Sequence, residues 1–578
     1  MSLFRRKARA IEPAVPAGQR ITSDADDIME TGRNRLVVVA AVFALAFTLV
    51  GARLVDLAVW QGGLQVVAEL DREQRPSADR AEIVDRNGVV LATNLATASL
   101  FAEPRKVLDA KEAASKIIRI LPELDRRDLE KKLSTDRAFV WLKRHLTPKQ
   151  QYDINALGVP GVGFRDDRKR VYPHGNLVAH VLGYTGVDNE GLAGVEKQFE
   201  DQLGLAAVNG PAPASADPLQ LSIDVRVQFA LQQELSNAVE EFSALGAAGI
   251  VLDAVSGEVL AMVSLPDFDP NQARTASPNA MFNRAALGVY EMGSTFKAFT
   301  TAMALDAGTV KIGGGYDATK PLRVARFTIR DDHPKARWLS VPEIFIYSSN
   351  IGAAKMAVDV GTEGQREFLG RLGLLKRTSL ELPEVGAPMS PSPWREINTM
   401  TVAFGHGIAV SPIQLTSAMA SLVNGGVRVD PTLLARQPMV APQGTRVMKT
   451  RTSSIMKRLM RLNVESGTGT KAKAAGYLTG GKTGTAEKAG AGGYRRKALL
   501  SSFIGAFPMN DPRYVVLVVI DEPKGTKKTF GYASGGWTAA PVFGRVVSRI
   551  GPLMGVAPVD EESKSVRNAM FIRVKAGG

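Results

Sequence analysis

The chain has 578 residues and a formal net charge of +14. Hydrophobic residues make up 45% of it, which is enough apolar material for the cores of several domains. It contains no cysteine, and this excludes disulfide frameworks, zinc–thiolate sites and cysteine nucleophiles. The basic residues form no long block with interleaved aromatic residues and the five histidines are scattered, so we expect no nucleic-acid partner, no metal and no cofactor.

The first predicted element is a membrane-spanning helix. Residues 36–52 are uncharged and apolar, and the apolar pattern continues to Leu57. At the helical rise such a run approaches the roughly 30 Å of a bilayer's hydrocarbon core. A cleaved signal peptide is the alternative, but the region before the run is too long for one. Because basic residues precede it, we expect residues 1–35 to be a cytoplasmic tail and 36–57 to span the membrane once.

Residues 58–220 are expected to form an α/β domain without a catalytic string, here called the pedestal. Segments 111–120 and 129–133 have the amphipathic pattern of helices, and residues 83–94 are typical of a hairpin. A stretch rich in proline and alanine, residues 211–218, predicts a loop before the next domain.

The largest predicted domain covers residues 221–550. An amphipathic helix over residues 226–242 leads into aliphatic runs around a turn at Ser256, and residues 501–521 predict a second hairpin. Strands from both ends with mostly helices between them predict one antiparallel sheet flanked by helices, an α+β fold. Residues 551–578 are charged and weakly patterned, which predicts a mobile C-terminal tail.

Three short strings in this domain carry the chemistry: G-S-T-F-K with Ser294 and Lys297, S-S-N from Ser348 to Asn350, and K-T-G-T from Lys482 to Thr485. In this order they form the S-x-x-K, S-x-N and K-T-G set of penicillin-binding proteins and serine β-lactamases. The trio therefore predicts a serine acyl-transfer site.

Ser294 is the expected nucleophile. It opens an apolar helix, where unpaired amides supply partial positive charge, and Lys297 lies one turn later on the same face. Burial among Phe296 and Phe299, together with nearby Lys482, should lower the pKa of Lys297 and allow it to act as general base.

The other two strings supply a relay and a binding surface. Ser348 can pass a proton between a lysine and the leaving amine, and Asn350 can bind a substrate amide. On a strand, Thr483 and Thr485 share one side, where their hydroxyls can bind a terminal carboxylate. Lys482 adds positive charge, and Gly484 is expected to keep the substrate backbone unobstructed. The amides of Ser294 and Thr485 are the expected oxyanion donors.

Single motifs are unreliable in this chain. Ser454 and Lys457 form a second S-x-x-K, and Ser277 begins another S-x-N upstream of the nucleophile. Residues 476–483 satisfy the phosphate-loop pattern, but no apolar strand precedes them and no helix follows. Order and spacing, not any one string, favour the acyl-transfer site.

Further segments resemble class B penicillin-binding proteins, the monofunctional peptidoglycan D,D-transpeptidases. The resembling segments are E-I-V-D-R-N-G-V-V-L-A (82–92), R-V-Y-P-H-G-N-L-V-A-H-V-L-G-Y-T-G (170–186), G-L-A-G-V-E-K-Q-F-E (191–200), S-G-E-V-L-A-M-V-S-L-P-D-F-D-P-N (256–271) and G-G-K-T-G-T-A-E-K (480–488). Two residues depart from the family, Ala81 where glycine is frequent and Met292 where proline is common. The segment F-G-H-G-I-A-V-S-P-I-Q-L (404–415) looks more like the septal, FtsI-type branch than the elongation branch.

The resemblance implies a membrane-anchored pedestal of the dimerisation type, followed by a penicilloyl-serine transferase domain outside the inner membrane, in the periplasm. It implies that peptidoglycan stem peptides are the substrates and that β-lactams acylate Ser294. A SEDS-type glycan polymerase and other cell-division proteins are the implied partners.

Three other functions remain open from the sequence. An elongation-type transpeptidase would share the whole site. A β-lactamase would need a residue that activates the deacylating water, and the sequence identifies none. A membrane-bound β-lactam sensor would need a cytoplasmic signalling domain, for which 35 N-terminal residues are too few.

Overall fold

The structure is a computed structural model that describes residues 40–53, 80–200, 217–324, 327–436, 443–490 and 493–572. The chain divides into two compact units, Met1–Pro76 and Ser77–Gly578.

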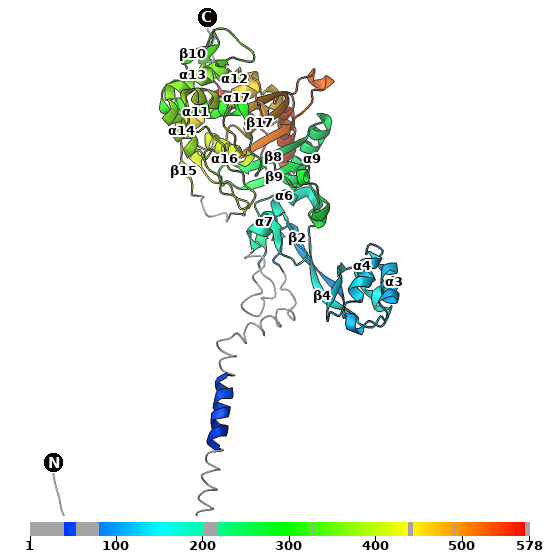
Figure 1. Ribbon diagram of the computed structural model, residues 1–578. Helices are drawn as coiled ribbons and strands as arrows, with labels where there is room; N and C mark the ends of the chain where they lie inside the picture. Colours follow the sequence, from blue (N-terminus) through cyan, green and yellow to red (C-terminus); the bar gives the residue numbers. More distant parts are fainter. Residues whose placement is uncertain are drawn as a thin grey trace, which may run out of the picture. The chain divides into compact units, whose positions relative to one another are not determined.

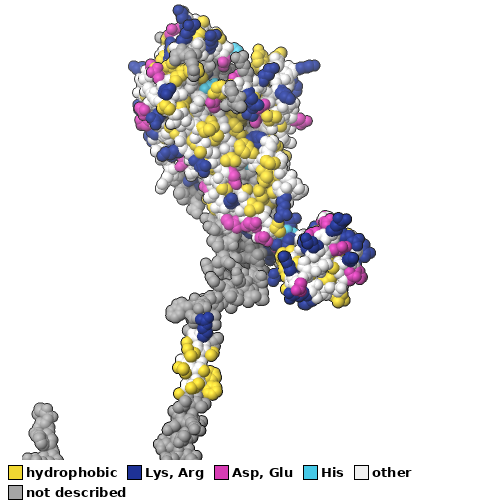
Figure 2. Space-filling model, in the orientation of Figure 1, with side chains coloured by type: hydrophobic (Ala, Val, Ile, Leu, Met, Phe, Trp, Pro, Cys, Tyr) yellow, Lys and Arg dark blue, Asp and Glu magenta, His cyan; other side chains and the backbone are white. Residues whose placement is uncertain are grey.

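In the first unit, residues 40–53 are helical, and Figure 2 shows hydrophobic side chains covering this helix. Its exposed apolar side chains include Val42, Phe43, Leu45, Phe47, Leu49 and Val50. No helix within the described ranges is both long and apolar enough to cross a membrane. The predicted tail, and the ends of the predicted span at residues 36–39 and 54–57, lie outside the described residues.

The pedestal is built on the long strand β2 (Val90–Ala102) (Figure 1). β2 pairs antiparallel with β1 (Ile83–Val84), β3 (Val140–Leu146) and β4 (Val162–Val171), and β1 pairs in parallel with β7 (Leu219–Gln220). The hairpin predicted over residues 83–94 is thus confirmed, although its second strand is longer than expected. Three helices enclose a core with one end of this sheet: α3 (Ala110–Ile120), α4 (Arg126–Leu133) and α5 (Pro148–Asn155). Most residues of the predicted loop at 211–218 lie outside the described residues.

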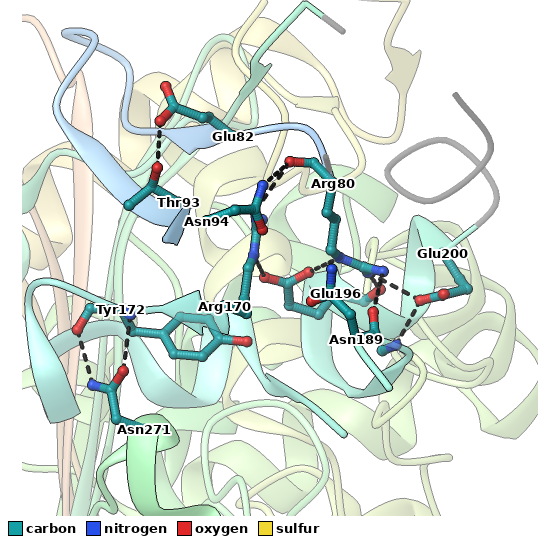
Figure 3. A network of polar contacts seen from close by, with 11 residues as sticks. Arg80, Glu82, Thr93, Asn94, Arg170, Tyr172, Asn189, Glu196, Glu200 and Asn271 are labelled. Atoms are coloured by element: carbon teal, nitrogen blue, oxygen red, sulfur yellow. Dashed lines mark hydrogen bonds and ion pairs between the residues drawn. The ribbon is translucent and has the colours of Figure 1, made fainter. Parts of the chain in front are cut away.

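A buried ion network in the pedestal joins three segments that are far apart in the sequence (Figure 3). Glu196, on the short helix α7 (Gly194–Gln198), accepts hydrogen bonds from Arg80 Nε at 2.5 Å and from Arg170 Nε, on β4, at 2.7 Å. All three side chains are buried. Arg170 ends the charged run R-D-D-R-K-R at residues 165–170, and it is buried although such runs are usually solvated surface. The remaining short elements of this region are α6 (Ala179–Leu182), β5 (Tyr184–Thr185) and β6 (Gly191–Ala193).

The second domain contains the predicted antiparallel sheet, with strand order β16-β17-β18-β8-β9. Chain order differs from spatial order because the two predicted hairpins lie at opposite ends of the domain sequence and pair through β18 and β8. The strands are β8 (Gly246–Asp253), β9 (Val259–Leu265), β16 (Gly480–Gly490), β17 (Gly493–Phe507) and β18 (Tyr514–Asp521).

Both faces of this sheet are covered, because side chains alternate along a strand. Val516 and Val518 of β18 pack with α9 (Val225–Glu241) and α18 (Ala539–Leu553). Val515 and Leu517 face the other way and pack with the helices that lie between the two hairpins in the sequence, here called the helical subdomain. Burial on both faces explains why β18 reads as an unbroken apolar run. The helices between the hairpins are α10 (Pro278–Met281), α11 (Phe296–Ala307), α12 (Val341–Ile346), α13 (Asn350–Val360), α14 (Thr362–Arg371), α15 (Glu396–Val402), α16 (Pro412–Val423) and α17 (Thr450–Ser466).

The helical subdomain also contains three two-stranded sheets among the residues that the structure describes. They are β10 (Gly315–Asp317) with β13 (Trp338–Ser340), β11 (Leu322–Val324) with β12 (Phe327–Ile329), and β14 (Val427–Arg428) with β15 (Thr445–Arg446).

The C-terminal segment differs from its prediction as a mobile tail. Residues after α18 include the helix α19 (Lys564–Met570), and Val566 and Met570 pack on the main core. Glu561 also pairs with the nearly buried Arg461 of α17 at 2.6 Å. The prediction was wrong for residues up to 572 because charge density alone does not reveal a tertiary ion pair that anchors a short helix.

Candidate active site

The structure brings the serine and lysine of the first string together. Ser294 lies in the 3₁₀ turn Gly293–Thr295, which leads directly into α11, and Lys297 occupies the first turn of that helix. Lys297 is only 1% exposed, and its Nζ lies 2.9 Å from Ser294 Oγ. The predicted contact between nucleophile and base is therefore present in the geometry.

Ser348 connects the first string to the third. It sits between α12 and α13 with φ of +59°, a left-handed conformation that costs about 1–3 kcal/mol for a residue other than glycine. Lys297 Nζ lies 2.5 Å from its carbonyl oxygen and 3.0 Å from its Oγ, and Lys482 Nζ lies 3.0 Å from the same Oγ. The strained serine is thus held where it touches both amines.

Both lysines are buried, and burial disfavours their charged forms. Burial lowers the pKa of Lys297 to about 8, although the charges of Asp332 and Asp331 raise it. Lys482 is fully buried on β16. Its pKa is held well below the usual value, mainly by burial and in addition by the charge of Lys297. Burial and mutual repulsion therefore both disfavour a state in which the two lysines are charged together.

The S-x-N loop is supported by a residue that the sequence did not reveal. The carboxylate of Asp331 accepts hydrogen bonds from Ser349 Oγ at 2.8 Å and from the Ile351 amide at 3.0 Å. Asn350 donates through Nδ2 to the carbonyl of Arg330 at 2.8 Å, which leaves its Oδ1 as an acceptor. No motif marks Asp331, because its role depends on a loop folding back over the start of α13.

The K-T-G-T strand is held by α17, by the loop that follows α17, and by the segment that precedes α18. Thr483 Oγ1 lies 2.8 Å from the hydroxyl of Thr468, and the Gly535 amide donates to Thr485 Oγ1 at 3.0 Å. Asn463 of α17 holds the same region, since its Nδ2 donates to the Gly481 carbonyl at 2.8 Å. The sequence did not reveal the roles of Thr468 and Asn463, because nothing in their local pattern links them to β16.

Gly484 is explained by packing. A Cβ at this position would lie 2.3 Å from Ser502 Oγ and 2.7 Å from the Met292 carbonyl. The glycine therefore allows β16 to approach the turn before Ser294, whereas the sequence led us to expect that it clears space for substrate.

The amides of Ser294 and Thr485 belong to segments in close contact. Gly293 has φ of +52°, and a Cβ there would come within 2.5 Å of the Thr485 carbonyl. Only glycine allows this approach, so the turn of the nucleophile lies directly against β16.

The competing motifs have other surroundings. Ser454 is partly exposed on α17 and donates to the Thr450 carbonyl, and Ser277 caps α10 by accepting from the Ala280 amide. Lys482 and Thr483 lie within β16, so no helix follows them as a phosphate loop requires. Within the described ranges, no group of three or more metal-binding side chains is arranged to hold a metal ion.

Comparison with known proteins agrees with this geometry. Residues 247–548 match the penicillin binding protein transpeptidase domain, and residues 75–205 match the penicillin-binding protein dimerisation domain. The chain is 43% identical to the probable peptidoglycan D,D-transpeptidase FtsI of Caulobacter vibrioides, over 82% of each protein. It is 30% identical to the peptidoglycan D,D-transpeptidase FtsI of Escherichia coli K12, over 87% of this chain and 88% of the relative.

Among solved structures, penicillin binding protein 3 of Mycobacterium tuberculosis in complex with aztreonam aligns with a TM-score of 0.66 at 24% identity. The alignment covers 84% of this chain and 98% of that structure. This likeness concerns the fold.

Proposed function

The chain belongs to the class B penicillin-binding proteins of the FtsI type, and from this membership we propose that Ser294 is the nucleophile of its transpeptidase reaction. The protein is a peptidoglycan D,D-transpeptidase of septal wall synthesis, with peptidoglycan peptides as substrates and β-lactams as ligands. The elongation-type alternative has no better support among the relatives. One observation carries the residue assignment: an unbroken chain of contacts from Ser294 through Lys297 and Ser348 to Lys482.

Lys297 is the proposed general base. A neutral amine has two N–H donors and one lone pair, whereas an ammonium group only donates. Nζ can donate to Ser348 O, Ser348 Oγ and Ser294 Oγ, and because a hydroxyl can also donate, the neutral amine can instead accept the proton of Ser294 while it donates to Ser348. Ser294 can then transfer its proton to Lys297 while Oγ bonds to the carbonyl carbon of the penultimate D-alanine.

Ser348 is the proposed proton relay to the leaving group. When the tetrahedral intermediate collapses, the C–N bond breaks and the departing nitrogen takes a proton from the Ser348 hydroxyl. Lys297 replaces that proton, because its Nζ lies 3.0 Å from the same oxygen. We assign the oxyanion to the amides of Ser294 and Thr485.

Asn350, Thr483 and Thr485 are the proposed substrate-binding residues. The Oδ1 of Asn350 can accept from a substrate amide, and the two threonine hydroxyls can donate to the terminal carboxylate. Lys482 is their electrostatic partner. Burial depresses the pKa of Lys482, and the negative charge of a bound carboxylate acts against this and favours the charged form of the lysine.

The second half-reaction distinguishes a transpeptidase from a β-lactamase. In the transpeptidase, an amine of a second peptide attacks the acyl carbon, and Ser294 Oγ leaves with the proton that the amine gives up. The test is the time course of a fluorescent penicillin on the detergent-solubilised full chain. We expect one label per protein that persists for many minutes; rapid release with turnover of the drug would contradict the proposal.

The pH dependence of acylation follows from Lys297. The reactive form of the base is the neutral amine, so the penicillin acylation rate constant should reach a plateau above pH 8. It should fall about tenfold for each pH unit below the folded pKa of about 8. A rate that does not change between pH 6 and pH 9 would contradict the role of Lys297.

A matched variant tests the cause of this profile. The charge of Asp332 raises the pKa of Lys297, so Asp332→Asn should move the acidic limb of the profile to lower pH. An unchanged limb would show that a different group titrates.

We also propose the membrane placement and the domain boundaries. Residues 36–57 are the proposed single span, residues 1–35 its cytoplasmic tail, and the boundary between pedestal and transpeptidase domains lies near residue 220, with the C-terminal segment from 551. Support comes from the helical, apolar and exposed residues 40–53 and from the basic residues that precede them. A SEDS-type polymerase and division proteins are the proposed partners, at the periplasmic face of the inner membrane.

A further inference from the structure

A pocket of about 550 Å³ lies beside the reacting groups and has no role in the mechanism above. Val289, Tyr290 and Glu291 line it, and the chain then enters the turn of Ser294. Ala486 and Glu487 line it as well, where β16 continues beyond Thr485. The pocket is thus formed by the same two segments that carry the nucleophile and the carboxylate-binding threonines.

The charges in this pocket are unbalanced. Glu291 accepts hydrogen bonds from the Gly407 amide at 2.8 Å and from the Tyr494 hydroxyl at 2.9 Å, both neutral donors. Glu487 is partly exposed, and no hydrogen bond or ion pair joins it to any side chain that the structure describes, a set that leaves out Arg496. The cation beside them, Lys488, is held by two other carboxylates, Asp521 at 2.8 Å and Glu522 at 2.9 Å.

The rest of the lining is largely apolar. Val289, Ala409 and Leu500 contribute hydrocarbon surface to the lining. Such a lining suits the methylene stem of a long side chain, and the carboxylates suit an ammonium group at its end.

The register of the strand indicates which part of the substrate reaches this pocket. β16 lies at one edge of its five-stranded sheet, so a peptide can be added to it as an antiparallel strand. With the terminal carboxylate at Thr483 and Thr485, each earlier residue lies about 3.4 Å further along β16. The residue before the two terminal D-alanines is then level with Ala486 and Glu487.

We propose that this pocket is a subsite for an ammonium-bearing side chain of the peptide substrate, with Glu487 as its main counter-charge. The inference rests on the proposed function, since it assumes that the peptide is acylated at Ser294. The strand register favours the donor peptide. The acceptor peptide also carries an amine, so the experiment has an arm for each.

The donor arm compares two peptides that end in lysyl-D-alanyl-D-alanine, one with a free lysine side chain and one with its Nε acetylated. For the full-length wild type, kcat/KM for D-alanine release should be about fivefold to tenfold higher with the free ammonium, and this ratio should fall as salt is raised. Glu487→Gln should reduce the ratio to below about twofold. The ratio within each variant cancels any general change in activity.

Two further variants control for nonspecific effects of charge. Glu396→Gln removes an exposed carboxylate at the start of α15 that does not line the pocket, and it should keep the wild-type ratio. Glu487→Lys should reverse the preference, so that a glutamyl side chain at the same position is favoured over the lysyl one.

The acceptor arm uses the acetylated donor and compares lysine amide with norleucine amide as attacking amines. A Glu487-dependent preference in this arm alone assigns the pocket to the acceptor, and in the donor arm alone to the donor. Equal rates for both members of each pair in the wild type, or ratios that Glu487→Gln leaves unchanged in both arms, would overturn the inference. If neither the acetylated peptide nor penicillin acylates the wild type, the proposed function itself fails.

Discussion

Ser294→Ala is expected to abolish covalent labelling by penicillin and release of D-alanine, by at least about four orders of magnitude. The alanine removes the oxygen that bonds to the acyl carbon. The neighbouring hydroxyl of Ser348 cannot replace it, because it lies between the two lysine amines. Labelling is measured by gel fluorescence, and release by amino-acid analysis.

The chain provides a matched control for this substitution. Ser454 also begins an S-x-x-K string, but it is only partly exposed on α17 and its hydroxyl donates to the backbone carbonyl of Thr450. Ser454→Ala should therefore label like the wild type. Label that persists in Ser294→Ala, or label lost in Ser454→Ala, would contradict the assignment of the nucleophile.

Glu196→Ala is expected to have the largest effect on stability. The side chain is fully buried and pairs with Arg80 and Arg170, which are 3% and 5% exposed (Figure 3). Removing it leaves two buried guanidinium groups without their shared carboxylate, a loss of about 3–5 kcal/mol. The thermal midpoint of the pedestal should fall by roughly 10 °C, as measured by calorimetry on the full chain.

Glu200 provides the comparison for this prediction. It also pairs with Arg80, at 3.0 Å, but its side chain is 40% exposed. Solvent screening limits such a pair to about 1 kcal/mol or less, so Glu200→Ala should shift the midpoint by only a few degrees. Equal shifts in the two variants would show that burial does not govern this network.

The sequence predicted the frame of the molecule well, for reasons that are local. The aliphatic runs around Ser256 and the run that became β18 have strand periodicity and clear turns, and the helix over residues 226–242 is amphipathic. The order of the three catalytic strings likewise implied one site. Their mutual distances in the structure agree with that prediction.

What the sequence did not reveal depends on tertiary contacts. Asp331 supports the S-x-N loop from another segment, and Glu291 meets Glu487 across the pocket only after β16 folds against the turn of Ser294. Arg170 lies in a basic run whose composition is typical of solvated surface, and only the fold brings Glu196 to it. Asp331 and Ser349 are 18 residues apart and Arg170 and Glu196 are 26 apart, so these partners belong to different elements and leave no local pattern.

The central claim is that an acyl group on Ser294 passes to an amine. The most direct test is time-resolved intact-protein mass spectrometry of the full chain with a peptide ending in D-alanyl-D-alanine, at increasing concentrations of an amine acceptor. We predict a transient adduct on Ser294, equal in mass to the peptide without its last D-alanine, that decays faster with more amine and yields the peptide–amine product. An adduct on another residue, or one that decays at a rate independent of the amine and yields only hydrolysed peptide, would contradict the account.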